Sequence, residues 1–253
     1  FTSKVGYVWK EMPFQSIGFQ NAFTNHNQQS YFGLNQYDIK QQSYYSNLIF
    51  NSIIGNTMHK FSTGLNFMYD KYSEYVNTFD VSRIDNSVGA FFEYTFDNND
   101  KLSYVLGGRM DYHNRLGAFV TPRFHLKYNA FENSVFRISA GRGKRAANIF
   151  AENQNLFASS RTISILGTKG EVYGLSPEIA WNYGVSFTQK FKLFSKSADV
   201  TVDFYRTDFQ NQVVVDVMQS PQELLFYDLD GKSYANSLQV DFNVELIKHL
   251  NLR

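Results

Sequence analysis

The sequence predicts an all-β protein built from the long antiparallel strands of a transmembrane outer-membrane β-barrel. Three observations favour this fold class. Apolar and polar side chains alternate with a period of two along most of the 253 residues. The alternating segments run for about 10–15 residues, whereas strands of soluble proteins usually have about 5–6 and a tilted membrane strand needs about 9–11. Shorter and longer connections also alternate along the chain, which is typical of outer-membrane barrels.

The alternation predicts about eleven strands and no helix. It is clearest in residues 178–191, where Trp181, Tyr183 and Val185 share one face and Asn182 and Ser186 lie on the other. The remaining expected strands, of which the first three are the noisiest, are 2–9, 15–32, 38–53, 59–72, 86–96, 101–112, 122–128, 135–142, 198–204 and 238–246.

The connections divide into two sets, which we expect on opposite rims. The short set, expected to face the periplasm, comprises Lys10–Phe14, Gly55–Met58, Asp97–Asp100, Asn129–Ser134, Leu193–Ser197 and Ile247–Leu250. The other set, expected to face the exterior, comprises Phe32–Gln36, Asn77–Asp85, Asn114–Thr121, Gly143–Pro177 and Asp216–Ser233.

The phase of the alternation predicts which face of each strand meets lipid. Val185, Phe187 and Phe242 are expected outside, because a charge facing lipid at the bilayer midplane costs about 2–4 kcal/mol. Charged residues of the opposite phase are then expected in a polar interior: Arg109, Arg123, Lys127, Arg137, Asp203, Asp241 and Glu245. Aromatic residues also gather at strand ends, as in the girdles where barrels meet lipid headgroups.

Composition narrows the functional classes. The chain has 24 Lys and Arg against 23 Asp and Glu, so it gives no electrostatic reason to expect a nucleic-acid partner. It has no Cys, which excludes disulfides, thiol catalysis and cysteine-ligated metals. We expect no cofactor. A soluble β-rich binding protein is the alternative to the membrane interpretation, since cross-strand aromatic pairs also occur in soluble sheets.

No motif predicts catalytic residues. Asp111 and His113 share a face and make a weak candidate for a metal site, because a third ligand is missing. Gly141–Arg145 lacks the spacing of a phosphate-binding loop, so its glycines are better explained by a bend in a strand. No serine has the context of an activated nucleophile.

The connection Gly143–Pro177 is the most informative segment, because it is far longer than the usual 4–6 or so residues. Its mixture of bulky apolar, amide and charged side chains predicts a structured loop that packs on another surface. We expect ligand-binding or loop-anchoring roles at the external mouth for Arg142, Arg145, Asn148, Glu152, Asn153 and Arg161. Glu152 is expected to pair with Arg142, Arg145 or Arg161.

Three segments resemble the TonB-dependent outer-membrane receptors, particularly the Bacteroidetes-type members. They are residues 121–128 (TPRFHLKY), residues 136–153 (FRISAGRGKRAANIFAEN), and Leu175–Glu178 followed by Asn182–Gly184. Phe204–Asp208 and Gln212–Asp216 also look like a strand and a loop base of that family. The motif-bearing part covers about 121–242, nearly half of the chain.

The resemblance implies a barrel of twenty-two strands around an N-terminal plug, in the outer membrane of a Gram-negative bacterium. It implies active uptake of a scarce small-molecule ligand, energised by the TonB complex, with outer-membrane lipid as the other partner. Residues 1–253 would then be one partial barrel domain, without the plug and the C-terminal strands. Candidate ligands are an iron–siderophore complex, cobalamin, haem or an oligosaccharide. The alternatives are a passive porin-like channel and a barrel adhesin or enzyme.

Overall fold

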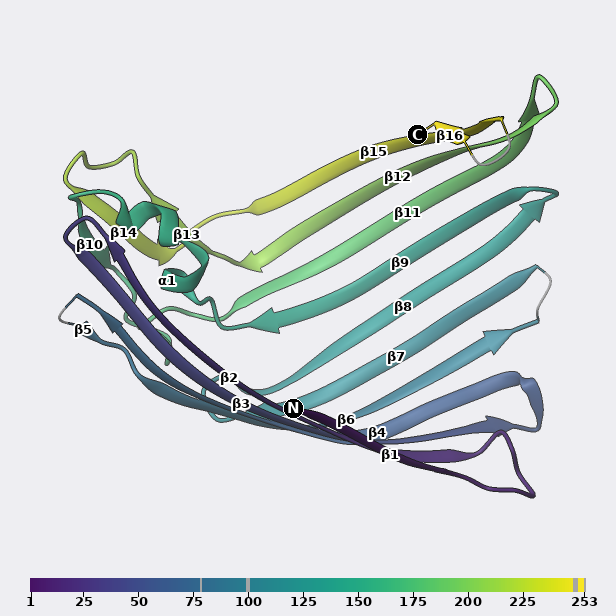
Figure 1. Cartoon of the computed structure of the whole chain (residues 1–253), viewed down its shortest axis with the longest axis horizontal. Helices are drawn as coiled ribbons and strands as arrows, with labels where there is room; N and C mark the ends of the chain where they lie inside the picture. The colour runs from purple at the N-terminus through teal and green to yellow at the C-terminus, as the bar shows by residue number, and fades with distance from the viewer. Residues whose placement is uncertain (78, 99–100, 248–249, 253) are drawn as a thin grey trace.

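Most of the chain forms one antiparallel sheet of 13 strands, shown in the computed structural model of Figure 1. The structure describes residues 1–77, 79–98, 101–247 and 250–252. The strands of the sheet are β1 (Thr2–Val8), β2 (Ser16–Phe32), β3 (Asn35–Ile54), β4 (Asn56–Val76), β5 (Phe79–Asp80), β6 (Arg83–Asp97), β7 (Leu102–His113), β8 (Gly117–Phe131), β9 (Ser134–Arg145), β11 (Glu178–Leu193), β12 (Lys196–Asn211), β15 (Ser233–Ile247) and β16 (Leu250–Leu252). All eleven predicted strands are therefore confirmed, and the barrel fold class with them.

The sheet is curled into a trough whose two edges, β1 and β16, lie far apart in Figure 1. Apart from β5, which pairs only with β4, the spatial order of the strands follows their order in the chain. Strands β3 and β4 contain 20 and 21 residues, three to four times the usual length of a soluble strand. Such length and simple order are what a membrane-crossing wall requires.

The two sets of connections lie on opposite rims, as predicted, because consecutive strands of the sheet are antiparallel (Figure 1). Tight turns on the short-turn rim include Gly55 and the pair Phe194 and Ser195, all with positive φ. Three predicted connections include residues outside the described ones: residue 78 in Asn77–Asp85, residues 99 and 100 in Asp97–Asp100, and residues 248 and 249 in Ile247–Leu250. The other rim carries the long connections between β9 and β11 and between β12 and β15.

The register of the ladders separates the two faces of the wall. Directly paired residues share a face, so Val185 lies with Ile138 and Phe204, whereas Arg137 lies with Lys127 and Ser186. Large apolar residues exposed on the outer face include Val185, Phe204, Leu238 and Val240. Buried polar residues of the inner face include Asn66, Asp70, Glu74, Arg83, Asp85, Ser87, Asp111 and His113.

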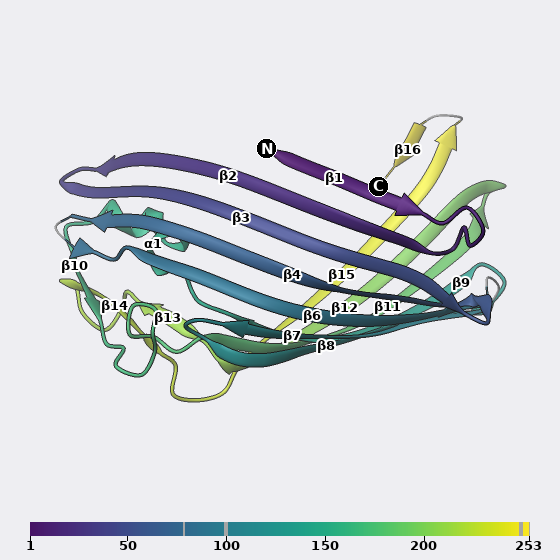
Figure 2. The same cartoon turned by 90° about the horizontal axis from the view of Figure 1, so that it is seen from below.

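The long connections form a second, smaller body inside the trough (Figures 1 and 2). Strand β10 (Thr162–Ile165) pairs in parallel with β14 (Glu223–Asp228), and β14 pairs with β13 (Val213–Asp216). The expectation that the chain contains no helix is wrong, because α1 (Ile149–Glu152) and a 3-10 turn η1 (Gln154–Phe157) precede this sheet. Four-residue helices are too short to show a helical period in a sequence. In the described part of the chain, no helix is long and apolar enough to cross a membrane.

The principal apolar core lies between the two bodies. Tyr37 and Ile39 of β3 and Val76 of β4 contact an apolar group from the long connections. Its buried members are Ala147, Ile149, Phe150, Phe157, Leu175, Leu224 and Phe226. The rings of Tyr37 and Phe157 stack with centroids 5.6 Å apart. The long connections are therefore folded inward onto the wall, and burial of this apolar surface holds them there.

Candidate functional site

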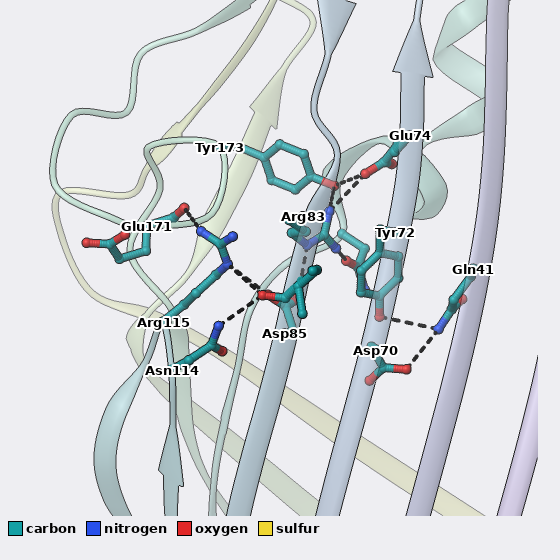
Figure 3. Close-up of polar contacts among 12 residues, drawn as sticks. Gln41, Asp70, Tyr72, Glu74, Arg83, Asp85, Asn114, Arg115, Glu171 and Tyr173 are labelled. Carbon is teal, nitrogen blue, oxygen red and sulfur yellow. Dashed lines mark hydrogen bonds and ion pairs between the residues drawn. The ribbon is translucent and has the colours of Figure 1, made fainter.

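Beside this core lies a buried cluster of charged and phenolic side chains, which we call the mouth cluster (Figure 3): Tyr72, Glu74, Arg83, Asp85 and Tyr173. Tyr72 of β4 is directly opposite Arg83 of β6, so both point into the trough. Glu74 and Asp85 follow two residues further along the same strands and share this face because strand side chains alternate. Tyr173 comes from the long connection between β9 and β11.

Arg83 lies at the centre of the mouth cluster. Its guanidinium donates to Glu74 Oε2 at 2.9 Å and to Asp85 Oδ2 at 3.0 Å. The Arg83, Glu74 and Asp85 side chains are only 6%, 1% and 8% exposed. The guanidinium also lies over the Tyr72 ring, 4.1 Å from its centroid. Burial of charges is tolerated only when they are paired and hydrogen-bonded, and here both conditions are met.

Tyr173 joins the long connection to this ion pair. Its hydroxyl donates to Glu74 Oε2 at 2.7 Å and accepts from Arg83 Nη1 at 2.7 Å. Burial, together with the negative charge of Glu74, raises the pKa of Tyr173, so its hydroxyl keeps its proton. Tyr173 and Gly174 both have positive φ, 55° and 77°, within a tight turn closed by the Leu175 amide on Val172 O. A tyrosine is unfavourable in this left-handed region, so its contacts hold the turn.

Further bonds tie the cluster to its surroundings. The Tyr37 hydroxyl donates to Glu74 Oε1 at 3.0 Å, and the Arg115 Nε donates to Asp85 Oδ1 at 2.9 Å. Arg83 also donates to the Asn148 side chain, at the start of the long connection. With Arg115 included, two guanidiniums balance two carboxylates, and the network joins β3, β4, β6, the β7–β8 turn and the long connection.

The predicted residue Glu152 makes its ion pair with Arg145. Two bonds of 3.0 Å join the Arg145 guanidinium to the Glu152 carboxylate, and a third of 2.8 Å joins it to Glu178. Glu152 also accepts from the Asn148 amide at 3.2 Å. These contacts lie at the point where the long connection leaves β9, outside the mouth cluster. This pair is more exposed than Arg83 and Glu74, so its net contribution to stability is smaller.

The other three predicted residues lie apart from one another. Asn153 donates to Ile149 O at 2.8 Å and so closes the C-terminus of α1. Arg161 donates to Val217 O at 2.7 Å and joins the two long connections. The hydrogen bonds of Arg142 go to Val120 O and the Gln210 side chain, on β8 and β12. These contacts are all within the protein, so they do not test a ligand-binding role for any of the six predicted residues.

A pocket of about 450 Å³ lies on the inner wall next to the mouth cluster. Asp70, Asp85, Arg109, Asp111 and His113 contribute to its lining. Arg109 donates to both carboxylate oxygens of Asp111, at 2.8 and 2.9 Å. The lining therefore offers carboxylates, a guanidinium and an imidazole as hydrogen-bonding groups, and it includes Ala146 and Asn148 at the start of the long connection.

Asp111 and His113, the pair considered as metal ligands, both have protein partners in the structure. The Asp111 carboxylate is occupied by Arg109, and His113 Nδ1 accepts from the Arg115 amide at 3.1 Å. Among the described residues, no group of three or more metal-ligating side chains occurs.

Sequence reasoning missed the mouth cluster. The alternation of β4 and β6 could have indicated it, because it places the charged residues Glu74, Arg83 and Asp85 on the inner face. All three lie near strand ends, beside a long connection. The sequence could not predict that Glu74 and Arg83 contact Tyr173, because Tyr173 lies 90 residues after Arg83 in the chain.

The sequence matches the family "TonB dependent receptor-like, beta-barrel" over residues 2–241. No curated protein matches the chain. Similar solved structures include a double mutant of the ferric enterobactin receptor PfeA from Pseudomonas aeruginosa, with 12% identity and a TM-score of 0.65, covering 99% of this chain and 42% of that one.

Two other solved structures have the same fold. The siderophore receptor PirA from Pseudomonas aeruginosa has 14% identity and a TM-score of 0.60, covering 99% of this chain and 55% of that one. The FpvAI–pyocin S2 complex has 10% identity and a TM-score of 0.62, covering 97% and 37%. The chain thus spans about half the length of these receptors, or less. The family is one of receptors and transporters of the Gram-negative outer membrane, and this chain belongs to it as a TonB-dependent receptor β-barrel domain.

Proposed function

We propose that this chain forms part of the wall and external mouth of a receptor that takes up a scarce small molecule across the outer membrane, using energy delivered by TonB. The observation that carries the proposal is the inward-folded pair of long connections beside a polar pocket. A passive channel needs an open mouth, whereas here an apolar core and a buried ion-pair network hold the connections over the inner wall.

The ligand classes are an iron–siderophore complex, cobalamin, haem and an oligosaccharide. Iron–siderophore complexes are tested first, because PirA is named a siderophore receptor and PfeA a ferric enterobactin receptor, and both share this fold. The pocket residues Arg109, Asp111 and His113 offer both donors and acceptors, which suits a polar ligand.

The test is uptake by cells that carry the full-length receptor, with each ligand class supplied separately in radiolabelled form. We expect saturable uptake of one class, lost when TonB is deleted. Shortening the long connection between Arg145 and Gly174 should abolish uptake while surface expression stays normal. TonB-independent, non-saturable entry of many solutes would show a porin-like channel and would refute the proposal.

A further inference from the structure

A shallow groove lies on the outward face of the wall, on the side away from the long connections. It spans strands β6 to β11, has a volume of about 630 Å³, and is bordered by Phe92, Tyr94, Leu106, Phe124 and Trp181. We call it the outer groove. Its floor has small side chains: Gly108 is directly opposite Phe92 on one side and Pro122 on the other, and Ala140 is opposite Phe124.

Gly108 leaves space that no protein atom fills. A Cβ at this position would meet nothing within 4 Å. The neighbouring Gly107 is different, because the Arg123 side chain fills the space on the inner face that a Cβ of Gly107 would take. A glycine within a strand often marks a place where another molecule approaches closely. In a wall facing lipid, an apolar groove of this kind is open to an acyl chain.

A cation lies at the external end of the outer groove. Arg142 follows Ala140 by two residues toward the external rim and is directly opposite Trp181, so the register places it on the outward face. The hydrogen bonds of its guanidinium in the described structure go to neutral oxygens, Val120 O at 3.0 Å and Gln210 Oε1 at 3.4 Å. A guanidinium has five donors, so donors remain for an anion.

A second arginine on the outward face, Arg206, differs from Arg142 because it is paired with a carboxylate of the protein. Arg206 also lies near the external ends of the strands, and it is directly opposite Tyr183 of β11. Its guanidinium is paired with both oxygens of Asp208, at 2.9 and 3.0 Å, and lies over the Tyr234 ring. Arg206 is therefore neutralised by the protein, whereas Arg142 has no carboxylate among its described partners.

We propose that the outer groove binds one lipid of the surrounding bilayer that carries a net negative phosphate headgroup. Its acyl chain would lie over Gly108 between Phe92 and Phe124, and its phosphate would accept hydrogen bonds from Arg142. A lipid fits this site because its apolar acyl chain matches the outer groove and its anionic headgroup matches Arg142 at the end of the groove. Arginine suits it, since its planar fork binds phosphate oxygens in pairs.

The test uses the full-length receptor, delipidated in detergent and titrated by native mass spectrometry. The probes are palmitoyl-oleoyl phosphatidylglycerol, the zwitterionic phosphatidylcholine of the same chains, and glycerol phosphate as a free headgroup. We expect one tight phosphatidylglycerol per receptor, with weaker binding of phosphatidylcholine and no competition from glycerol phosphate. Arg142→Gln should weaken the site about tenfold, the size of one charge-assisted hydrogen bond.

The matched variants separate a site from diffuse attraction. Gly108→Trp should fill the outer groove and remove the tight lipid, while Arg206→Gln, which removes the same charge elsewhere on this face, should leave affinity unchanged within about twofold. Heat-modifiable migration on gels checks assembly; if the tryptophan variant fails to assemble, Gly108→Leu takes its place. Equal losses in the two arginine variants, an unaffected filled groove, or equal binding of both lipids would overturn the proposal.

Discussion

Replacing Arg83 with methionine should release the long connection between β9 and β11 from the wall. The change removes the centre of the mouth cluster and leaves the Glu74 and Asp85 carboxylates buried without their common partner. Removing one partner of a buried ion pair costs about 3–5 kcal/mol. Glu74 keeps the Tyr37 and Tyr173 hydroxyls and Asp85 keeps Arg115, so we take the lower figure of about 3 kcal/mol.

A cost of about 3 kcal/mol raises the open fraction of the connection roughly 150-fold if the closed state bears the whole penalty. Hydrogen–deuterium exchange of the full-length receptor in detergent measures this directly. The amides to follow are those bonded in the closed connection, such as Glu152 on Asn148 O, Leu166 on Phe226 O and Leu175 on Val172 O. Their exchange should accelerate by about two orders of magnitude, while β7 to β9 stay protected.

Two variants control this experiment. Arg206→Met breaks an exposed outward pair whose side chains are 40% and 42% exposed, so it should not alter exchange in the connection. Adding Glu74→Gln to Arg83→Met removes the stranded charge and should restore part of the protection. Unchanged exchange in the Arg83 variant, or the same acceleration in the Arg206 variant, would refute the anchoring role of the mouth cluster.

Two further predictions concern the wall itself. Cysteines introduced one at a time into a full-length receptor that is otherwise free of Cys report topology. Met218→Cys should react with a membrane-impermeant maleimide on intact cells and Ser195→Cys should not; the reverse labelling pattern would show the opposite orientation. Gly64→Ala should impair barrel assembly, measured by heat-modifiable migration, because its Cβ would overlap the backbone oxygen of Leu48. Gly108→Ala, with open space at the Cβ, is the matched control and should assemble normally.

The wall was predictable because its pattern is local and repetitive. In β11, Trp181, Tyr183 and Val185 alternate with polar residues, and one slipped residue would invert the whole strand. The period of two therefore fixes the strand, its two faces and the rim on which each turn lies. The same local pattern could not reveal α1 or β10, because four-residue elements within a long connection are specified by the surface they pack on.

The candidate site was predictable only in part. The length and composition of the segment after β9 indicated a structured loop, and Glu152 was expected to pair with an arginine; Arg145 provides the partner. Arg142 was grouped with it from proximity in the chain, yet the alternation of β9 directs it to the opposite face from Arg145. Ligand-binding or loop-anchoring roles stay predictions for all six residues: Arg142, Arg145, Asn148, Glu152, Asn153 and Arg161.

The sequence by itself determined the strands, the polarity of the wall and the family, since each depends on residues close together in the chain. Only the tertiary structure decided that the long connections fold inward and that Glu74, Arg83 and Tyr173 meet in one buried cluster. The physical reason is that hydrophobic burial is non-directional and leaves the choice of surface open. The curvature of the sheet then makes the inner faces of β3 and β4 the place where Phe150, Phe157 and Phe226 lose their contact with water.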